Sequence, residues 1–219
     1  MPDSDTPSLE QLIHTQPHLW RGRTRSGHHN APVISTGFAE LDASLPDGGW
    51  PASGLMEWIV PHWGVGELRL LMPLLLHLNS QARWCAWLSA PYTPYAPALV
   101  SHGFDLRYLL IINRISGGKT KQVDQNLFWS MEKLLANPAC GVVLAWPQQP
   151  SVKHLRRLQS VATNNKNLVI IFQQQALANT PTPLRIRLTS ENNNDDKALN
   201  IEILKARGSL SRRSLRLVL

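Results

Sequence analysis

The chain has 219 residues, of which 43% are hydrophobic, and it carries a formal net charge of +7 with a pI of about 9.8. This length is enough for one well-buried core, and no apolar run approaches the 18 or so residues that span a bilayer. The polar start, MPDSDTPSLEQL, argues against a secretory signal. Cys85 and Cys140 lie within apolar runs, so we expect reduced, buried thiols in a cytoplasmic protein rather than a disulfide or a redox pair.

Residues 1–30 are polar and contain proline, glycine and histidine. We expect a flexible N-terminal segment there, with at most one short helix near residues 8–14. His28 and His29 are adjacent, but no cysteine or carboxylate stands at ligand spacing from them. A pair of loop histidines is therefore favoured over a pair of ligands, and we expect no metal site.

From residue 31 onwards, apolar runs alternate with helical patterns. In VISTGFAELDASL, the apolar positions Phe38, Leu41 and Leu45 mark a helical turn. The segments that predict strands are 55–60, 84–90, 108–114, 141–146 and 168–172, and those that predict helices are 68–78, 94–103, 123–137 and 151–162. Pro73 should kink the first of these helices or shorten its first turn, and Ser151 is the predicted N-cap of the last.

The predicted strands are continuously apolar and are separated by helices, which is typical of a parallel sheet covered on both faces, an α/β fold. After residue 180 the pattern changes, because PLRIRLTS, ALNIEILKAR and SLRLVL alternate polar with apolar residues. ENNNDD between the first two marks a hairpin turn. We therefore expect a flexible segment at 1–30, an α/β core at 31–180, and a C-terminal antiparallel β-hairpin extension with a basic tail at 181–219.

The stretch EWIVPHWGVGELRLL has the strand–loop–helix outline of a phosphate-binding loop, with Gly64 and Gly66 in the loop. Such a loop, G-x-x-x-x-G-K-[ST], surrounds phosphates with backbone N–H groups and adds a lysine and a Mg²⁺-binding hydroxyl. If Gly66 is the second glycine, the first falls on Pro61, the lysine on Glu67 and the hydroxyl on Leu68. The loop therefore predicts no nucleotide cofactor.

The other parts of an ATPase site are also missing from the sequence. The run GVVLAWP ends in Ala145 and Trp146 where an Asp for Mg²⁺ would stand, and Pro91 follows the run WCAWLSA where a catalytic carboxylate would stand. There is no G-x-S-x-G elbow and no H-E-x-x-H motif. Asp42 and Glu57 are the best-placed carboxylates, and a structural role is favoured for both. We expect no enzyme activity.

Aromatic residues are abundant, with eight tryptophans in the chain. Trp84, Trp87 and Trp146 fall in predicted strands, where core packing is expected. Four others, Trp50, Trp63, Tyr92 and Tyr95, fall in loops assigned to the carboxyl ends of strands, the edge at which open α/β sheets bind ligands. Exposed aromatics there would suit a protein contact, although loop aromatics also close the end of a core. Trp63, Tyr92 and Tyr95 are the candidate partner contacts.

The second group of candidate contacts is the basic tail. It consists of Lys205, Arg207, Arg212, Arg213 and Arg216, with no acid after Glu202. A DNA or acidic-protein contact and a purely solubilising surface are equally compatible with this pattern. If the contact is real, changing Arg212 and Arg213 to Glu should weaken binding without lowering stability.

These residues resemble three related families. ISTGFAELDASLPDGGWPASGLMEWIV looks like the segment of RecA recombinases that leads into their nucleotide loop. The combination of GGWP, GELRLLMPLL, APYTPYAPAL, GFDL and CGVVLAWP is similar to the ImuA family, RecA-like proteins associated with translesion DNA synthesis, from about Val33 to Phe172. The SulA family of SOS cell-division inhibitors shares the pattern of a Leu-rich helix with a central proline, LLMPLL in this chain, followed by a W-x-x-W-L strand.

The ImuA resemblance implies a RecA-like fold with a degenerate phosphate loop. It also implies a non-catalytic adaptor of the SOS-induced translesion complex, whose partners would be an ImuB-type inactive Y-family polymerase and an error-prone DnaE-type polymerase, with RecA as a further candidate partner. The family's expected ImuB-binding region falls on the tail from about Lys205 to Leu219. The SulA resemblance implies the alternative, an inhibitor that binds FtsZ and blocks septum formation. The N-terminal residues, the ISTGFAELD segment and the basic tail favour the adaptor.

Overall fold

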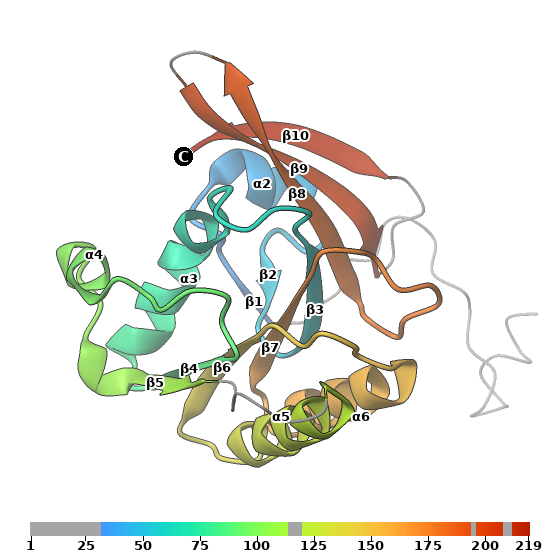
Figure 1. Cartoon of the computed structure of the whole chain (residues 1–219). Coiled ribbons are helices and arrows are strands. Elements are labelled where there is room, and N and C mark those ends of the chain that lie inside the picture. The colour runs from blue at the N-terminus through green and yellow to red at the C-terminus, as the bar shows by residue number, and fades with distance from the viewer. Residues whose placement is uncertain (1–31, 114–119, 194–195, 208–211) are drawn as a thin grey trace, which may run out of the picture.

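An eight-stranded sheet runs through the molecule in the order β10-β9-β8-β3-β7-β6-β4-β5 (Figure 1). The computed structural model describes residues 32–113, 120–193, 196–207 and 212–219. The strands are β1 (Val33–Ile34), β2 (Trp50–Pro51), β3 (Gly54–Ile59), β4 (Trp84–Leu88), β5 (Leu109–Ile112), β6 (Cys140–Ala145), β7 (Leu168–Gln173), β8 (Leu184–Asn193), β9 (Asp196–Ala206) and β10 (Arg213–Val218). The short β1 and β2 form a separate antiparallel pair.

Helices cover both faces of the sheet (Figure 1). They are α2 (Ala39–Ser44), α3 (Glu67–Ser80), α4 (Ala96–Ser101), α5 (Thr120–Leu135) and α6 (Val152–Asn164), with a 3₁₀ turn at Leu106–Tyr108. Ser151 caps α6 as predicted, because its hydroxyl accepts a hydrogen bond from the His154 backbone N–H at 3.3 Å. The segments around residues 8–14 and His28–His29 lie outside the described residues.

Parallel pairing dominates the sheet, as the continuous apolar runs predicted. The pairs β3–β7, β7–β6, β6–β4, β4–β5 and β3–β8 are parallel, and β8–β9 and β9–β10 are antiparallel. The mixed α/β architecture with a mostly parallel central sheet is therefore confirmed, and so is the hairpin of β8 and β9. The hairpin continues the sheet itself, because β8 pairs directly with β3.

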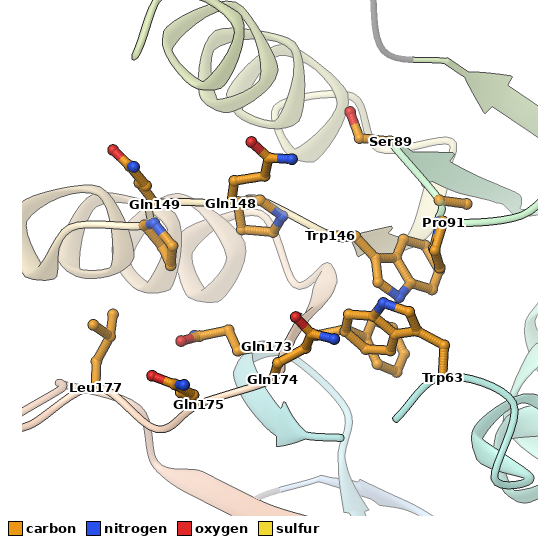
Figure 2. Close-up of a pocket in the computed structure, with 14 residues that line it drawn as sticks. Trp63, Ser89, Pro91, Trp146, Gln148, Gln149, Gln173, Gln174, Gln175 and Leu177 are labelled. Carbon is orange, nitrogen blue, oxygen red and sulfur yellow. The ribbon is translucent and has the colours of Figure 1, made fainter. Parts of the chain in front are cut away.

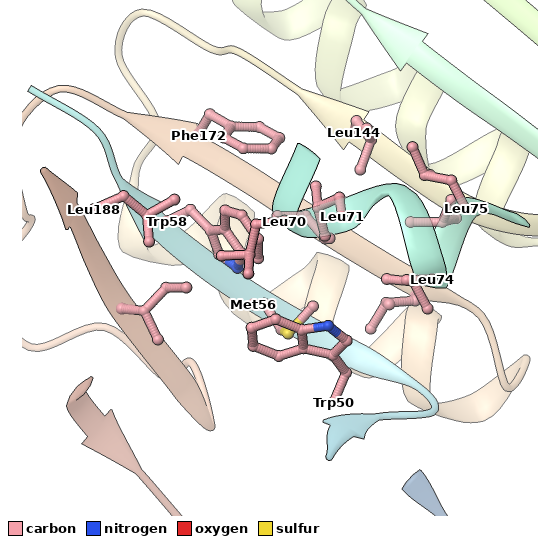
Figure 3. Packing of buried hydrophobic residues seen from close by; sticks show 14 of the residues in the cluster. Trp50, Met56, Trp58, Leu70, Leu71, Leu74, Leu75, Leu144, Phe172 and Leu188 are labelled. Atoms are coloured by element: carbon pink, nitrogen blue, oxygen red, sulfur yellow. The ribbon is translucent and has the colours of Figure 1, made fainter. Parts of the chain in front are cut away.

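Two apolar layers form, one on each face of the sheet. Figure 3 shows the layer under α2 and α3, where the Trp58 ring lies 5.4 Å from Trp50 and 5.6 Å from Phe172 between centroids. The second layer, between the sheet and α5 and α6, contains Leu55, Val143 and other aliphatic side chains. Both layers are continuous across strands, because each central strand is buried on both faces.

Two tryptophans lie elsewhere than predicted. Trp50 belongs to β2 and is fully buried in the α2/α3 layer rather than standing in a loop at the carboxyl edge. Trp84 is 40% exposed rather than part of the core, because it is the first residue of β4, and its ring meets Tyr108 edge-on at 6.2 Å. Trp87 and Trp146 are buried as expected.

Helix α3 continues through Pro73 as a single α-helix from Glu67 to Ser80. Its Pro73 ring lies against Gly37, where an added Cβ would stand 2.6 Å from the proline ring atoms. Gly37 also has a φ of +84°, which favours glycine. The segment before α2 thus packs closely on α3. Within the described residues, no helix is both long and apolar enough to cross a membrane.

Candidate functional site: the carboxyl edge of the parallel strands

The β3–α3 loop, residues 60–66, closes on a carboxylate of its own chain. Gly64 and Gly66 have φ values of +87° and +117°, and their backbone N–H groups point at the side chain of Glu67. Glu67 Oε1 accepts from Gly64 N at 2.9 Å, and Oε2 accepts from Gly66 N at 3.1 Å. The carboxylate thus takes the hydrogen bonds that a phosphate would take in a nucleotide-binding loop.

Glu67 is also the first residue of α3 and is 7% exposed. A negative charge at this end of a helix is stabilised by the macrodipole. The carboxylate that would repel a phosphate therefore also stabilises the start of α3 and satisfies two N–H donors of the loop. The other two positions that depart from the phosphate-loop pattern, Pro61 and Leu68, also make contacts within the protein. Leu68 is half-buried against the α2/α3 layer, and the Pro61 carbonyl accepts from Gln174 Nε2 at 3.4 Å.

Gly66 is closed in from another direction. An added Cβ at Gly66 would lie 2.9 Å from Cδ1 of Leu219, which follows β10. Leu219 is one of the partly buried residues packed against the α2/α3 layer. The loop is therefore enclosed by Glu67 on one side and by Leu219, the residue directly after the last strand, on another.

Beside the loop lies a pocket of about 850 Å³, formed by the last residues of β7 and by the segments that follow β3, β4, β6 and β7 (Figure 2). Its lining consists of Trp63, Ser89, Ala90, Pro91, Trp146, Pro147, Gln148, Gln149, Pro150, Phe172, Gln173, Gln174, Gln175 and Leu177. Because the strands are parallel, all four segments meet at one edge of the sheet, where ligands of open α/β folds bind. Trp63, a candidate partner contact, and Pro91, which stands where a catalytic carboxylate would, thus line the same pocket.

Aromatic rings form one end of the pocket, and amide groups extend across the rest (Figure 2). Trp146 and Phe172 stack with their centroids 4.5 Å apart and an interplanar angle of 6°. The buried indole nitrogen of Trp146 has no hydrogen-bond partner. No charged side chain is among the lining residues, so the pocket is suited to a neutral, hydrogen-bonding surface rather than to a phosphate.

One wall of the pocket is held by a buried carboxylate on α5. Asp124 is 4% exposed, and its side chain accepts from the backbone N–H of Gln149 at 2.7 Å and of Gln148 at 3.4 Å. These contacts fix the segment between β6 and α6. The side chains of Gln148 and Gln149 therefore project from a backbone that the Asp124 carboxylate holds in place.

Tyr92 and Tyr95 lie outside the pocket lining, in the segment between β4 and α4. Their side chains are 72% and 73% exposed. Trp63 is half-buried and lines the pocket. The carboxyl edge therefore combines a recessed neutral pocket with two exposed tyrosines on the β4–α4 segment, whose first residues line that pocket.

The candidate residues of the basic tail are distributed over the β8–β10 extension and do not line this pocket. They are Lys205, Arg207, Arg212, Arg213 and Arg216, all exposed. Lys205 Nζ donates to the Thr180 carbonyl at 2.9 Å, and Arg213 Nη1 donates to the Ser44 carbonyl at 3.1 Å. Arg213 therefore reaches towards α2, and Lys205 towards the segment before β8.

Both carboxylates singled out in the sequence have structural roles. Asp42 accepts from the Ser35 hydroxyl at 2.7 Å and from the Thr36 N–H at 2.8 Å, which holds the turn before α2. Glu57, in the centre of the sheet, is fully buried. It accepts from Arg185 Nη2 at 3.0 Å and also bonds Gln173 and Thr180.

The glutamines of the pocket were not among the candidate residues. Their signal was present in the sequence, because Pro-Gln-Gln-Pro and Gln-Gln-Gln each come directly after an apolar run. Residues that follow parallel strands meet at the same edge of the sheet. Two such runs after two predicted strands could therefore have indicated an amide-lined surface.

Two curated proteins similar to this chain are both named cell division inhibitor SulA. The protein from Photorhabdus laumondii is 32% identical over 107 residues, which cover 49% of this chain and 56% of the relative. The protein from Edwardsiella piscicida is 26% identical over 106 residues, which cover 48% of this chain and 59% of the relative. The chain thus spans a little over half the length of these relatives. No protein-family profile matches it.

This similarity makes the chain SulA-like over about half its length. The relatives' name agrees with the SulA alternative of the sequence analysis better than with the translesion adaptor. The ImuA resemblance and its polymerase partners stay predictions.

Proposed function

We propose that this chain is a non-catalytic inhibitor of cell division that acts by binding a partner protein at the carboxyl edge of its parallel strands. The observation that carries the proposal is the Glu67 carboxylate on the amides of Gly64 and Gly66. With those donors already used, the loop is better suited to a scaffold than to nucleotide hydrolysis. The name of the two relatives supports the choice of cell division as the process.

FtsZ is the partner that this proposal assigns. The exposed rings of Tyr92 and Tyr95 and the half-buried Trp63 would be the anchors, because Tyr and Trp carry a large share of binding energy at protein interfaces. The neutral pocket beside them would accept uncharged groups of the partner, since its amides can both donate and accept hydrogen bonds.

The test is inhibition of FtsZ GTPase activity and polymerisation by the purified chain. We expect inhibition in proportion to complex formation, and loss of more than about 1 kcal/mol of binding free energy on changing Tyr92 and Tyr95 to Ala. Trp129→Ala is the matched control, because Trp129 is a 61% exposed aromatic on α5 that does not line the pocket. The control should leave binding unchanged.

A parallel capture experiment separates the two functional hypotheses. The chain is immobilised and offered FtsZ, an ImuB-type protein, a DnaE-type polymerase and RecA separately. Capture of FtsZ with suppression of its GTPase supports the inhibitor. Capture of the ImuB-type protein without any effect on FtsZ would overturn the proposal in favour of the translesion adaptor.

A further inference from the structure

Helices α5 and α6 lie side by side on one face of the sheet, and two contacts between them fix how they face each other (Figure 1). The Phe128 ring of α5 stacks on the His154 ring of α6 with the centroids 4.1 Å apart. Further along both helices, Glu132 Oε1 lies 2.6 Å from Arg157 Nε. Because the contacts advance along both helices together, α5 and α6 run in the same direction. Their outward-facing residues therefore form one continuous surface.

This surface carries an accessible aromatic ring beside a cation. Trp129, the residue after Phe128, is 61% exposed, which is more than any other tryptophan whose side chain is described. Lys133 follows it one helical turn later and places its Nζ 5.6 Å from the centroid of the Trp129 ring. The indole is thus held next to a positive charge and remains open to a ligand.

The neighbouring helix adds more cations to this surface. Lys153, Arg156 and Arg157 of α6 are all exposed. Arg157 is paired with Glu132, as described above. In the part of the chain that the structure describes, no ion pair involves Lys133, Lys153 or Arg156. Three positive charges on the surface are therefore without an anionic partner.

The other charged groups nearby do not offset these cations. Asp124 of α5 is 4% exposed, and its carboxylate accepts from two backbone N–H groups. Asp47 and Arg207, one charge of each sign, line a hollow of about 210 Å³ that residues of α6 also line. Lys166, just after α6, is a further exposed cation. The surface therefore has a positive excess.

The shape of this surface favours a single-stranded nucleic acid over a lipid bilayer. Leu155, Leu158 and Ala162 of α6 are buried against the sheet, so the helix has no exposed apolar face with which to enter a membrane. One accessible ring among cations instead matches a base and the phosphates on either side of it. Bases within a duplex are already stacked on each other, so an unpaired strand suits the ring better.

We propose that the outer surface of α5 and α6 binds single-stranded nucleic acid without sequence preference. Trp129 stacks on a base, and Lys153 and Arg156 contact phosphates. Charge complementarity and the accessible indole select this occupant. None of these three residues lines the pocket at the carboxyl edge. The activity therefore goes beyond the inhibition of cell division and uses a different surface.

Fluorescence polarisation of labelled oligonucleotides of about 15 nucleotides, single-stranded and duplex, tests the proposal. Between about 50 and 200 mM salt, the logarithm of the binding constant should fall linearly with the logarithm of the salt concentration. The single strand should bind more tightly than the duplex. Lys153→Gln and Arg156→Gln should each weaken binding on the order of fivefold near 0.1 M salt and reduce the slope by roughly 0.7.

Trp129→Ala should weaken binding of the single strand by at least about fivefold. Its salt slope should stay that of the parent, because the indole carries no charge. An abasic oligonucleotide of the same length should bind the parent and Trp129→Ala equally, since it offers no base on which the ring could stack. This comparison separates stacking from any effect of Trp129 on the structure.

Two control variants match these substitutions. Arg69→Gln removes an exposed arginine from α3, on the other face of the sheet, and should change neither affinity nor slope. Changing Tyr92 and Tyr95 to Ala should impair FtsZ inhibition and leave oligonucleotide binding intact, whereas Trp129→Ala should do the reverse. The two proposals therefore fail independently. Urea denaturation of all variants checks that they fold alike.

The proposal is overturned if no single-stranded oligonucleotide binds near 50 mM salt. It is also overturned if binding is insensitive to Trp129→Ala, Lys153→Gln and Arg156→Gln. Binding to phosphatidylglycerol vesicles, but not to oligonucleotides, would assign the surface to a membrane instead. Binding to poly-glutamate alone would assign it to an acidic protein.

Discussion

Glu67 shows how one side chain can change what a loop does. A glutamate directly after Gly66 reaches back to the loop N–H groups, and the residue also sits at the positive end of α3. The local sequence Gly-Val-Gly-Glu therefore builds its own anion into the loop. The backbone geometry of an anion-binding turn is kept, while the anion is covalently part of the protein.

Replacing Glu67 by Ala should lower the free energy of unfolding by about 1 to 3 kcal/mol, because two loop donors and a helix terminus lose their acceptor. Glu67→Gln should cost less, since an amide oxygen can still accept one of the two bonds. Urea denaturation measures the difference. Glu40→Ala, at an exposed glutamate in α2, is the control. A Glu67→Ala protein as stable as the parent would contradict the assigned role.

At the scale of elements, the extension is tied to the parallel sheet by a buried ion pair. Glu57 in β3 is fully buried, and the Arg185 side chain in β8 is 12% exposed. Thr180 and Gln173 provide further hydrogen bonds to the carboxylate. The pair joins adjacent parallel strands whose residues are more than a hundred positions apart in the chain.

Removing one member of this pair should be more damaging than removing both. Glu57→Leu leaves a mostly buried guanidinium without its carboxylate, and the expected cost is about 3 to 5 kcal/mol. Combining it with Arg185→Met should recover part of that loss, because no uncompensated charge remains. A double-mutant cycle from denaturation midpoints gives the coupling energy. Additive losses would mean that the two side chains act independently.

Element types were largely predictable from the sequence, while their spatial order was not. Continuous apolar runs such as 141–146 and 168–172 identify strands buried on both faces, and the structure forms strands there. The same runs carry no information about neighbours, so the central position of β3 and its pairing with β8 could not be read from them. Pro73 was expected to disturb its helix, yet α3 continues through it and packs the proline against Gly37.

The candidate site was also predicted only in part, because the sequence does not specify which distant segments become neighbours. The loss of nucleotide chemistry could be read from Pro61, Glu67 and Leu68, because that chemistry needs particular residue types at fixed spacing. The hydrogen bonds from the loop to Glu67 depend on backbone dihedrals, which spacing alone does not specify. Glutamines have no characteristic spacing at all, and the pocket that they line forms only when strands distant in sequence become neighbours.

At the scale of the whole molecule, each of the two buried apolar layers contains one cysteine, so the reactivity of each thiol reports on the opening of one layer. Cys85 belongs to the α2/α3 layer and Cys140 to the α5/α6 layer, and neither forms a disulfide. Burial raises the pKa of the Cys85 thiol to about 12 and that of Cys140 to about 11. Because thiolates are the reactive form, both thiols should be inert to alkylation in the native protein at about pH 8.

Labelling each cysteine across a urea titration should therefore follow global unfolding. Each of the variants Cys85→Ala and Cys140→Ala keeps one thiol, which reports on the layer that contains it. If the two layers unfold together, the urea midpoint of labelling in each variant should coincide with the midpoint of that variant's global unfolding. The raised pKa values favour the folded state below about pH 9, and this contribution is lost as the pH rises through 11 to 12. Labelling of one thiol well before the loss of helical signal would show that its layer opens alone.

The central position of β3 also has a consequence for the order in which the protein can assemble during synthesis. β3 is made early, at residues 54–59, yet its two neighbours in the sheet are β7 and β8, at residues 168–173 and 184–193. Until both strands have left the ribosome, β3 has neither of its hydrogen-bonding partners, and its apolar side chains cannot be buried in the native sheet. Folding must therefore be late and dominated by long-range contacts, which slows it. A nascent chain stalled before β8 should bind chaperones strongly, and one extended past β10 should release them.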